Sequence, residues 1–227
     1  VSKDIFNKNI TVEVDAYYKD LQNLVDYKDG ADLFANPTLE TEVFNVLGES
    51  YGLEFFVEKK RGKLKGTISY TYSRSRRVSN SPFLVEQINR GRVYPANLDI
   101  PHSGKAVGTY KLGPATELNA TFTYSSGRVF TAPLGKFEFD NTDFPLFLDR
   151  NNERTTDIHR LDLALSVKLN GTKKLWQGDM VFSVYNVYGK RNAFSAFFQD
   201  FPGEPPGLYQ LTIIDSPFPS ISYEFEF

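Results

Sequence analysis

Alternation of apolar and polar residues along long segments is the feature that most constrains the fold of this chain. It is clearest between Lys63 and Arg74, where residues 64, 66, 68, 70 and 72 are Leu, Gly, Ile, Tyr and Tyr and the residues between them are Lys, Thr or Ser. Successive side chains of a strand point to opposite faces, so this period of two predicts strands with one apolar and one polar face. The pattern recurs over residues 10–19, 118–125, 160–168 and 221–227.

Turn-forming residues divide the chain into strands joined by connections that alternate in length. Eight strands are predicted, at 8–29, 43–60, 63–76, 102–112, 116–128, 156–169, 178–198 and 207–227. Short turns are expected at 61–62, 113–115 and 170–172, and long connections at 30–42, 77–101, 129–155 and 199–206. Prolines at 217 and 219 predict an irregularity in the last strand, because proline cannot donate to a ladder.

The length of the strands favours a membrane barrel over a soluble sandwich. A mean hydropathy of -0.37 and short apolar runs are compatible with barrel strands, which show lipid only every second residue. Several predicted strands exceed the ~5 to 6 residues typical of sandwiches and reach the ~9 to 11 of a tilted membrane crossing. An all-β, antiparallel transmembrane β-barrel is therefore predicted. Its lipid-facing side chains would include Leu64, Ile68, Tyr70, Leu161, Leu163 and Leu165.

Composition excludes several other classes of function. The chain has no Cys and a net charge of -2, so we expect neither a thiolate metal site nor a nucleic-acid partner. His102 and His159 are the only histidines and have no metal-ligand spacing, and no catalytic constellation is found. The acidic residues Glu138, Asp140 and Asp143 lack the spacing of a calcium loop. We therefore predict no enzyme activity, no cofactor and no metal.

One long connection, 77–101, contains a candidate ligand site. Arg90, Arg92, Tyr94 and Asp99 could hold a polar or anionic solute through guanidinium contacts and aromatic stacking. The alternative is that these residues only tie the loop down, as most loop charges do not bind ligands.

Three stretches, 94–112, 184–198 and 208–227, resemble TonB-dependent outer-membrane receptors, especially those carrying an N-terminal carboxypeptidase-regulatory-like domain. The alternating aromatics Tyr223, Phe225 and Phe227 also resemble the signal by which the outer-membrane assembly machinery recognises barrels.

The resemblance implies a 22-stranded barrel closed by a plug, which takes up a siderophore, cobalamin, oligosaccharide or peptide with energy from the TonB complex. Residues 1–227 would then be the C-terminal part of the barrel, without the plug and earlier strands, and with both ends of the segment in the periplasm. Its partners would be outer-membrane lipid, the rest of the receptor chain with the plug, the TonB complex through the N-terminal part, the assembly machinery and a surface lipoprotein lid. In a barrel of that size the first and eighth strands would not pair with each other. The alternative is a complete eight-stranded barrel acting as an adhesin or anchor, with a lumen filled by side chains.

Overall fold

The computed structural model describes residues 2–5, 9–140, 142–169, 177–199 and 207–226, and it is all-β and antiparallel. One large sheet dominates, and in it strands that follow one another along the chain lie side by side. Its strands, in spatial order, are β1 (Ser2–Ile5), β2 (Ile10–Tyr27), β3 (Val43–Lys59), β4 (Leu64–Ser79), β6 (His102–Lys111), β7 (Thr116–Ser125), β12 (Ile158–Lys168), β13 (Gln177–Tyr185) and β16 (Phe218–Glu226). The short β5 (Tyr94–Pro95) pairs with β4 beside this path.

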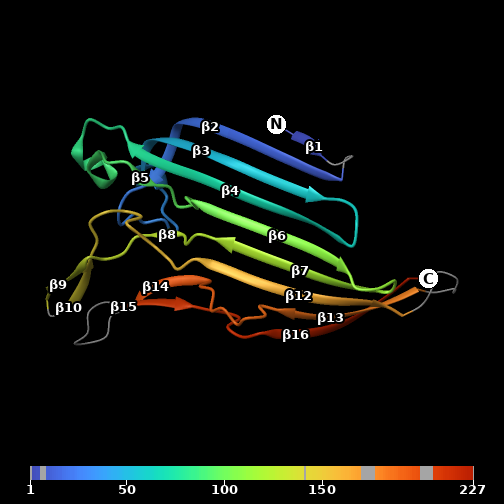
Figure 1. Ribbon diagram of the computed structural model, residues 1–227. Helices are drawn as coiled ribbons and strands as arrows, with labels where there is room; N and C mark the ends of the chain where they lie inside the picture. Colours follow the sequence, from blue (N-terminus) through green and yellow to red (C-terminus); the bar gives the residue numbers. More distant parts are fainter. Residues whose placement is uncertain (1, 6–8, 141, 170–176, 200–206, 227) are drawn as a thin grey trace.

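The two ends of the sheet differ in the connections they carry. At one end, called the turn end here, β3–β4 and β6–β7 are joined by tight turns, whereas the other, the loop end, carries the long connections (Figure 1). In the described residues, the loop-end connections contain three two-stranded sheets and three short 3-10 helices. These are β8 (Val129–Phe130) with β11 (Glu153–Arg154), β9 (Gly135–Phe139) with β10 (Thr142–Leu146), β14 (Ser195–Gln199) with β15 (Gly207–Leu211), and η1 (Leu39–Glu42), η2 (Leu84–Glu86) and η3 (Ile88–Gly91).

The antiparallel strands are confirmed, as are the short turns after β3 and β6, but the strand count needs correction. A further strand, β1, precedes the first predicted one, and two of the predicted strands are each divided. The predicted strand 178–198 is interrupted after β13, where Asn186 has a φ of 56° and its side chain bonds the backbone of Lys190 in a tight turn. The predicted strand 207–227 is interrupted between β15 and β16, in the proline-containing region where an irregularity was expected. The predicted turn at 170–172, and all of the predicted connection 199–206 beyond residue 199, lie outside the described residues.

The register aligns apolar residues into rows that cross the sheet. One row runs from Val57 through Ile68, Ala106 and Phe122 to Leu161. We call the side of the sheet that carries this row the apolar face. The next row, whose side chains point to the opposite, polar face, consists of Glu58, Thr67, Val107, Thr121 and Asp162.

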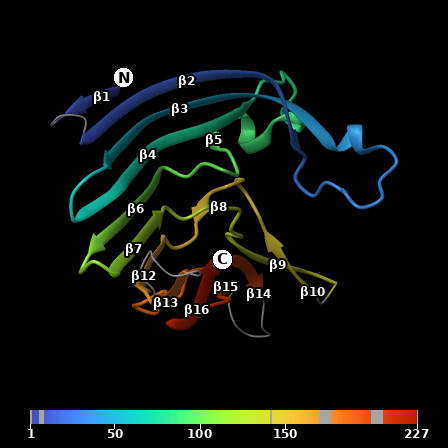
Figure 2. The same ribbon diagram turned by 90° about the vertical axis from the view of Figure 1, so that its right-hand side faces the viewer.

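The apolar face is exposed, as predicted for lipid-facing side chains. Leu64, Ile68 and Tyr70 are 50%, 59% and 38% exposed, and the leucines of β12 are half-buried among their neighbours. The sheet curves into an arc that stays open, with β5 and β8 on its concave side (Figure 2). β1 and β16 are its two edges, and within the described chain no register joins the first long strand, β2, to β16.

Strand β2 contains a bulge close to the loop end. Two residues, Gln22 and Asn23, lie opposite one residue of β3, and Asn23 has a φ of 57°. The extra residue reverses the alternation, so that Asp26 reaches the ion pairs of the polar face. Among the described residues, no helix is both long and apolar enough to span a membrane.

Candidate functional site

The loop end contains the only cluster of buried apolar residues in the described chain. Val46 of β3, Ile88 of η3 and Tyr94 of β5 are each 1% exposed, with Leu24 and Phe44 packed against them. The connection between β4 and β6 is therefore folded back onto the sheet instead of extending into solvent. This packing positions the charged groups around it.

Asp26 is the centre of the first charged group. Its carboxylate is 2.8 Å from the Tyr94 hydroxyl, which donates to it, and 3.0 Å from guanidinium nitrogens of both Arg77 and Arg150. Burial, and then the hydrogen bond to Asp26, raise the pKa of Tyr94 well above its usual value. Tyr94 therefore stays protonated and acts as a donor.

Asp99 is the centre of the second group. One carboxylate oxygen accepts a 2.6 Å bond from the backbone N–H of Ser75, and the other pairs with Arg154. Arg154 also donates to the Asp99 and Gly127 carbonyl oxygens, at 2.7 and 3.1 Å. Asp99 is 1% exposed. A buried carboxylate is costly unless it is paired, and here Arg154, from a different connection, compensates its charge. The connection 126–157 is thereby attached to β4 and to the connection 80–101.

A third group lies at the surface of the same two connections. Both oxygens of Asp149 accept 2.7 Å bonds from Arg92, and Arg90 donates to one of them at 2.8 Å. Beside it, the Asn89 side chain bonds the backbone N–H and C=O of Arg150, at 2.7 and 3.1 Å. Asn89 and Arg90 have positive φ angles of 52° and 58°, which non-glycine residues adopt rarely, so the contacts stabilise an otherwise unfavourable backbone.

The four predicted ligand residues thus fall into two kinds. Tyr94 and Asp99 are buried and are used to hold the loops together, whereas the side chains of Arg90 and Arg92 are 63% and 58% exposed. The contacts of Tyr94 and Asp99 attach the connection to the sheet, as expected if these two residues anchor the loop. A ligand role for the set stays a prediction, and the two exposed arginines are the members that a solute could reach.

Sequence reasoning missed the partners of these residues. Asp26, Arg77, Arg150 and Arg154 come from three other parts of the chain, and alternation gives no signal for which loops meet. The only available hint is positional, since all four lie where predicted strands meet long connections at the loop end.

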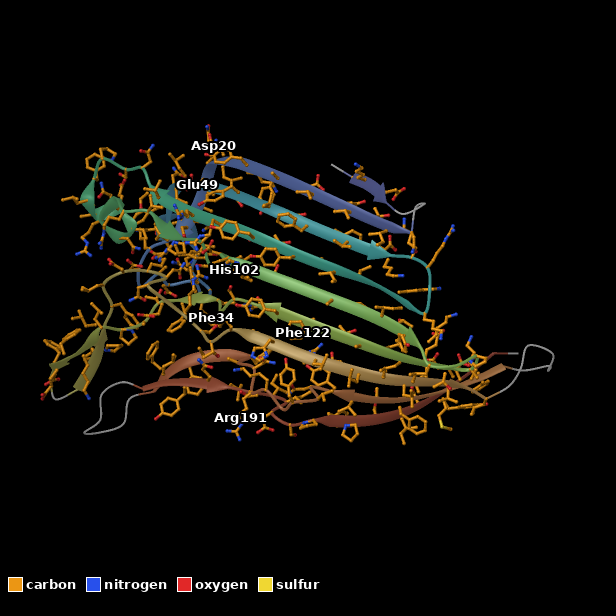
Figure 3. The ribbon with its side chains drawn as sticks, viewed as in Figure 1. Asp20, Phe34, Glu49, His102, Phe122 and Arg191 are labelled. Atoms are coloured by element: carbon orange, nitrogen blue, oxygen red, sulfur yellow. The ribbon has the colours of Figure 1, made fainter. Side chains whose placement is uncertain are left out.

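Polar aromatic side chains form a band on the apolar face near the loop end. Tyr70 and His102 share a 2.7 Å hydrogen bond, and His159 and Tyr188 share one of 2.8 Å. Figure 3 shows His102 nearer the loop end than Phe122, which lies further along the sheet. The two histidines are satisfied by aromatic neighbours, and no group of described residues has the composition of a metal site. The side chain of Asp143 is outside the described residues.

The predicted assembly signal is described in part. Tyr223 and Phe225 of β16 lie on one face, with stacked rings 5.9 Å apart and exposures of 45% and 58%. Phe227 lies outside the described residues. Recognition of these aromatics by the assembly machinery stays a prediction.

Comparison with known proteins gives no relative from which a function could be transferred. No protein-family model, curated protein or solved structure matches the chain. Its function must therefore be argued from its own residues.

Proposed function

We propose that this chain is part of the wall of a transmembrane β-barrel in a bacterial outer membrane. The observation that carries the proposal is the exposed apolar face, which crosses the sheet from β3 to β12 in register while the opposite face is mainly polar. Water on this face would be in contact with side chains such as Ile68, Phe122 and Ile221, which are 59%, 40% and 70% exposed. Exposing apolar side chains to water is unfavourable, and contact with lipid removes this free-energy cost, at about 25 cal/mol for each Å² taken from water.

The height of the apolar face fits a bilayer. From Leu64 to Tyr72 strand β4 advances about 27 Å, at about 3.4 Å per residue. A strand tilted by about 40° then covers about 20 Å of thickness, close to the apolar band of about 25 Å on outer-membrane barrels. The aromatic band with Tyr70 and His102 lies at one border of this region, as the girdle of such a barrel does.

We further propose that the wall belongs to a TonB-dependent receptor that takes up a scarce solute such as a siderophore, cobalamin, oligosaccharide or peptide. The support is the resemblance of three stretches of sequence together with the open arc, in which β1 and β16 are opposite edges. The alternative, a complete eight-stranded adhesin or anchor, would need the first and last long strands to pair. In the receptor the turn end is periplasmic, the loops face outward beneath any lipoprotein lid, and this segment has no catalytic role.

Site-specific labels test the wall in the full-length protein. The chain has no cysteine, so Ile68→Cys and Thr67→Cys each introduce one unique thiol into it, on adjacent residues of opposite faces. With an environment-sensitive fluorophore in reconstituted vesicles, we expect quenching by spin-labelled lipid at residue 68 and little at residue 67. Equal quenching by a water-soluble agent at both positions would contradict a lipid-facing surface.

The receptor proposal needs a separate readout. Purified full-length protein should be retained by the immobilised periplasmic domain of TonB, and a variant without its N-terminal TonB-binding segment should not. A protein that passes the lipid test but is not retained would be a barrel of another kind.

A further inference from the structure

Strand β3 continues past the end of its neighbour β4 at the loop end. The last registered pair between these two strands is Val46 with Ser79, whereas β3 extends to Val43. After Ser79 the chain leaves the sheet and enters the connection that contains η2 and η3. A notch is therefore left beside residues 43–45, which are still paired with β2 on their other side.

The backbone of β3 has an open edge in this notch. The carbonyl oxygen of Glu42 accepts a 2.9 Å bond from the N–H of Lys28, so it points toward β2. Backbone groups of successive strand residues point to opposite sides, and those of Val43 therefore point into the notch. In the described part of the chain, no residue bonds to the Val43 backbone on that side. An open strand edge of this kind can pair with a further extended chain.

A polar hollow of about 540 Å³ lies at the notch. Its volume is within the range of about 300–1,000 Å³ that is typical of small-ligand sites. Three exposed carboxamides line it, those of Asn23, Asn45 and Asn80, and none of them is hydrogen-bonded to another described residue. A carboxamide offers both donors and an acceptor, which are the groups that a peptide unit requires of its partners.

The hollow is also lined by one cation and one anion, Lys28 and Glu86. The Lys28 ammonium lies over the ring of Phe44, 5.5 Å from its centroid, and the Glu86 carboxylate accepts a hydrogen bond from the Ser81 hydroxyl. Among the described residues, neither of the two has an oppositely charged partner. A ligand that carries both a carboxylate and an ammonium group would complement them.

We propose that this hollow binds a short peptide with free termini in an extended conformation. The peptide pairs with the open edge at Val43, the three carboxamides bond its peptide units, and its two charged ends lie near Lys28 and Glu86. The proposal rests on the proposed function and deepens it, because it selects peptide among the solutes of the receptor. An oligosaccharide would use the carboxamides but would leave the two charges and the strand edge unmatched.

Binding of trialanine to the full-length protein in detergent, measured by calorimetry, tests the site. It is compared with trialanine blocked at both termini and with trialanine methylated on both peptide nitrogens. We expect the free peptide to bind and the blocked one to bind up to about 25-fold more weakly, because each exposed charge contact contributes up to about fivefold. Loss of both N–H donors should weaken binding on the order of tenfold.

A pair of variants separates the charges from the rest of the site. Lys28→Gln with Glu86→Gln should remove the difference between free and blocked trialanine and leave binding of the blocked peptide unchanged. The matched control is Lys105→Gln with Glu153→Gln, which also exchanges one cation and one anion. Both control residues are exposed and neither lines the hollow, so the difference between the two peptides should persist.

The outcomes distinguish this site from the membrane wall. Equal affinity of the unaltered protein for free and blocked trialanine, or no effect of methylation, would overturn the peptide site. Binding of maltotriose in place of trialanine would also overturn it, because the carboxamides would then recognise hydroxyl groups. Absence of trialanine binding together with lipid quenching at residue 68 would overturn the site and leave the wall intact. Trialanine binding without that quenching would contradict the wall and support the site.

Discussion

The loop end and the middle of the large sheet are stabilised by different means. At the loop end, polar and charged side chains are buried and paired, with Asp26 and Asp99 only 6% and 1% exposed. In the middle, strands pair by backbone bonds but their apolar side chains remain exposed, as Ile68 does. The loop end is thus held mainly by contacts among its own residues, whereas the apolar side chains in the middle of the sheet are left to their surroundings. In this chain, the exposed apolar side chains of the sheet say more about the surrounding medium than the small buried cluster at the loop end does.

The largest effect should follow removal of a buried loop charge. Asp99→Ala leaves Arg154 without its carboxylate, which should cost about 3 kcal/mol, the low end of the range for broken buried pairs because the Arg154 side chain is 30% exposed. Hydrogen exchange of the Ala96 and Ser73 amides should then accelerate on the order of 100-fold. The control is Asp29→Ala, which removes an Arg150 partner whose side chain is 71% exposed and should cost under about 1 kcal/mol. Similar exchange rates of these amides in the two variants would mean that burial of the carboxylate does not determine how much an ion pair stabilises the loop end.

A smaller effect is expected at the exposed arginines. Arg92→Gln removes one guanidinium nitrogen that contacts both Asp149 oxygens, and the two side chains are 58% and 33% exposed, so the change should cost about 0.2–1 kcal/mol. Exchange of the Arg150 amide should rise a few-fold at most, and Arg128→Gln should not change it. If exchange is unchanged in Arg92→Gln while solute capture by the full-length protein falls tenfold, Arg92 binds ligand and does not tie the loop.

The smallest effect concerns pH. The hydrogen bond from Tyr124, and then that from the Gly127 N–H, lower the pKa of Asp157 below its usual 3.8. Because the folded pKa is the lower one, these bonds contribute fully above pH about 4 and are lost as pH falls through the folded value. Exchange of the Gly127 amide should therefore increase only in acid. Tyr124→Phe should move that increase to higher pH, and a profile identical to that of the unaltered protein would contradict the role of the hydroxyl.

The sequence predicted the strands far better than the loop contacts. Alternation over 63–74 gave β4 and the facing of Ile68, because a period of two is local information. The Asp99–Arg154 pair joins residues that are distant along the chain, so no local pattern reports it. The division of 178–198 was missed because it depends on a turn at Asn186, whose backbone N–H bonds Asp162 of a different strand.

The bulge in β2 gives this strand a position that can absorb a change in chain length. The extra residue between Leu21 and Leu24 lies outside the regular pairing, and beyond it Leu24 and Asp26 pair with Val46 and Phe44. A codon deletion at Asn23 would remove the bulge and leave these pairs in place, so Asp26 would stay beside Tyr94 and Arg77. Asn23 itself is exposed, so replacing it by glycine, which accepts a positive φ, should also be nearly silent. At this position the strand tolerates both the loss and the exchange of a residue.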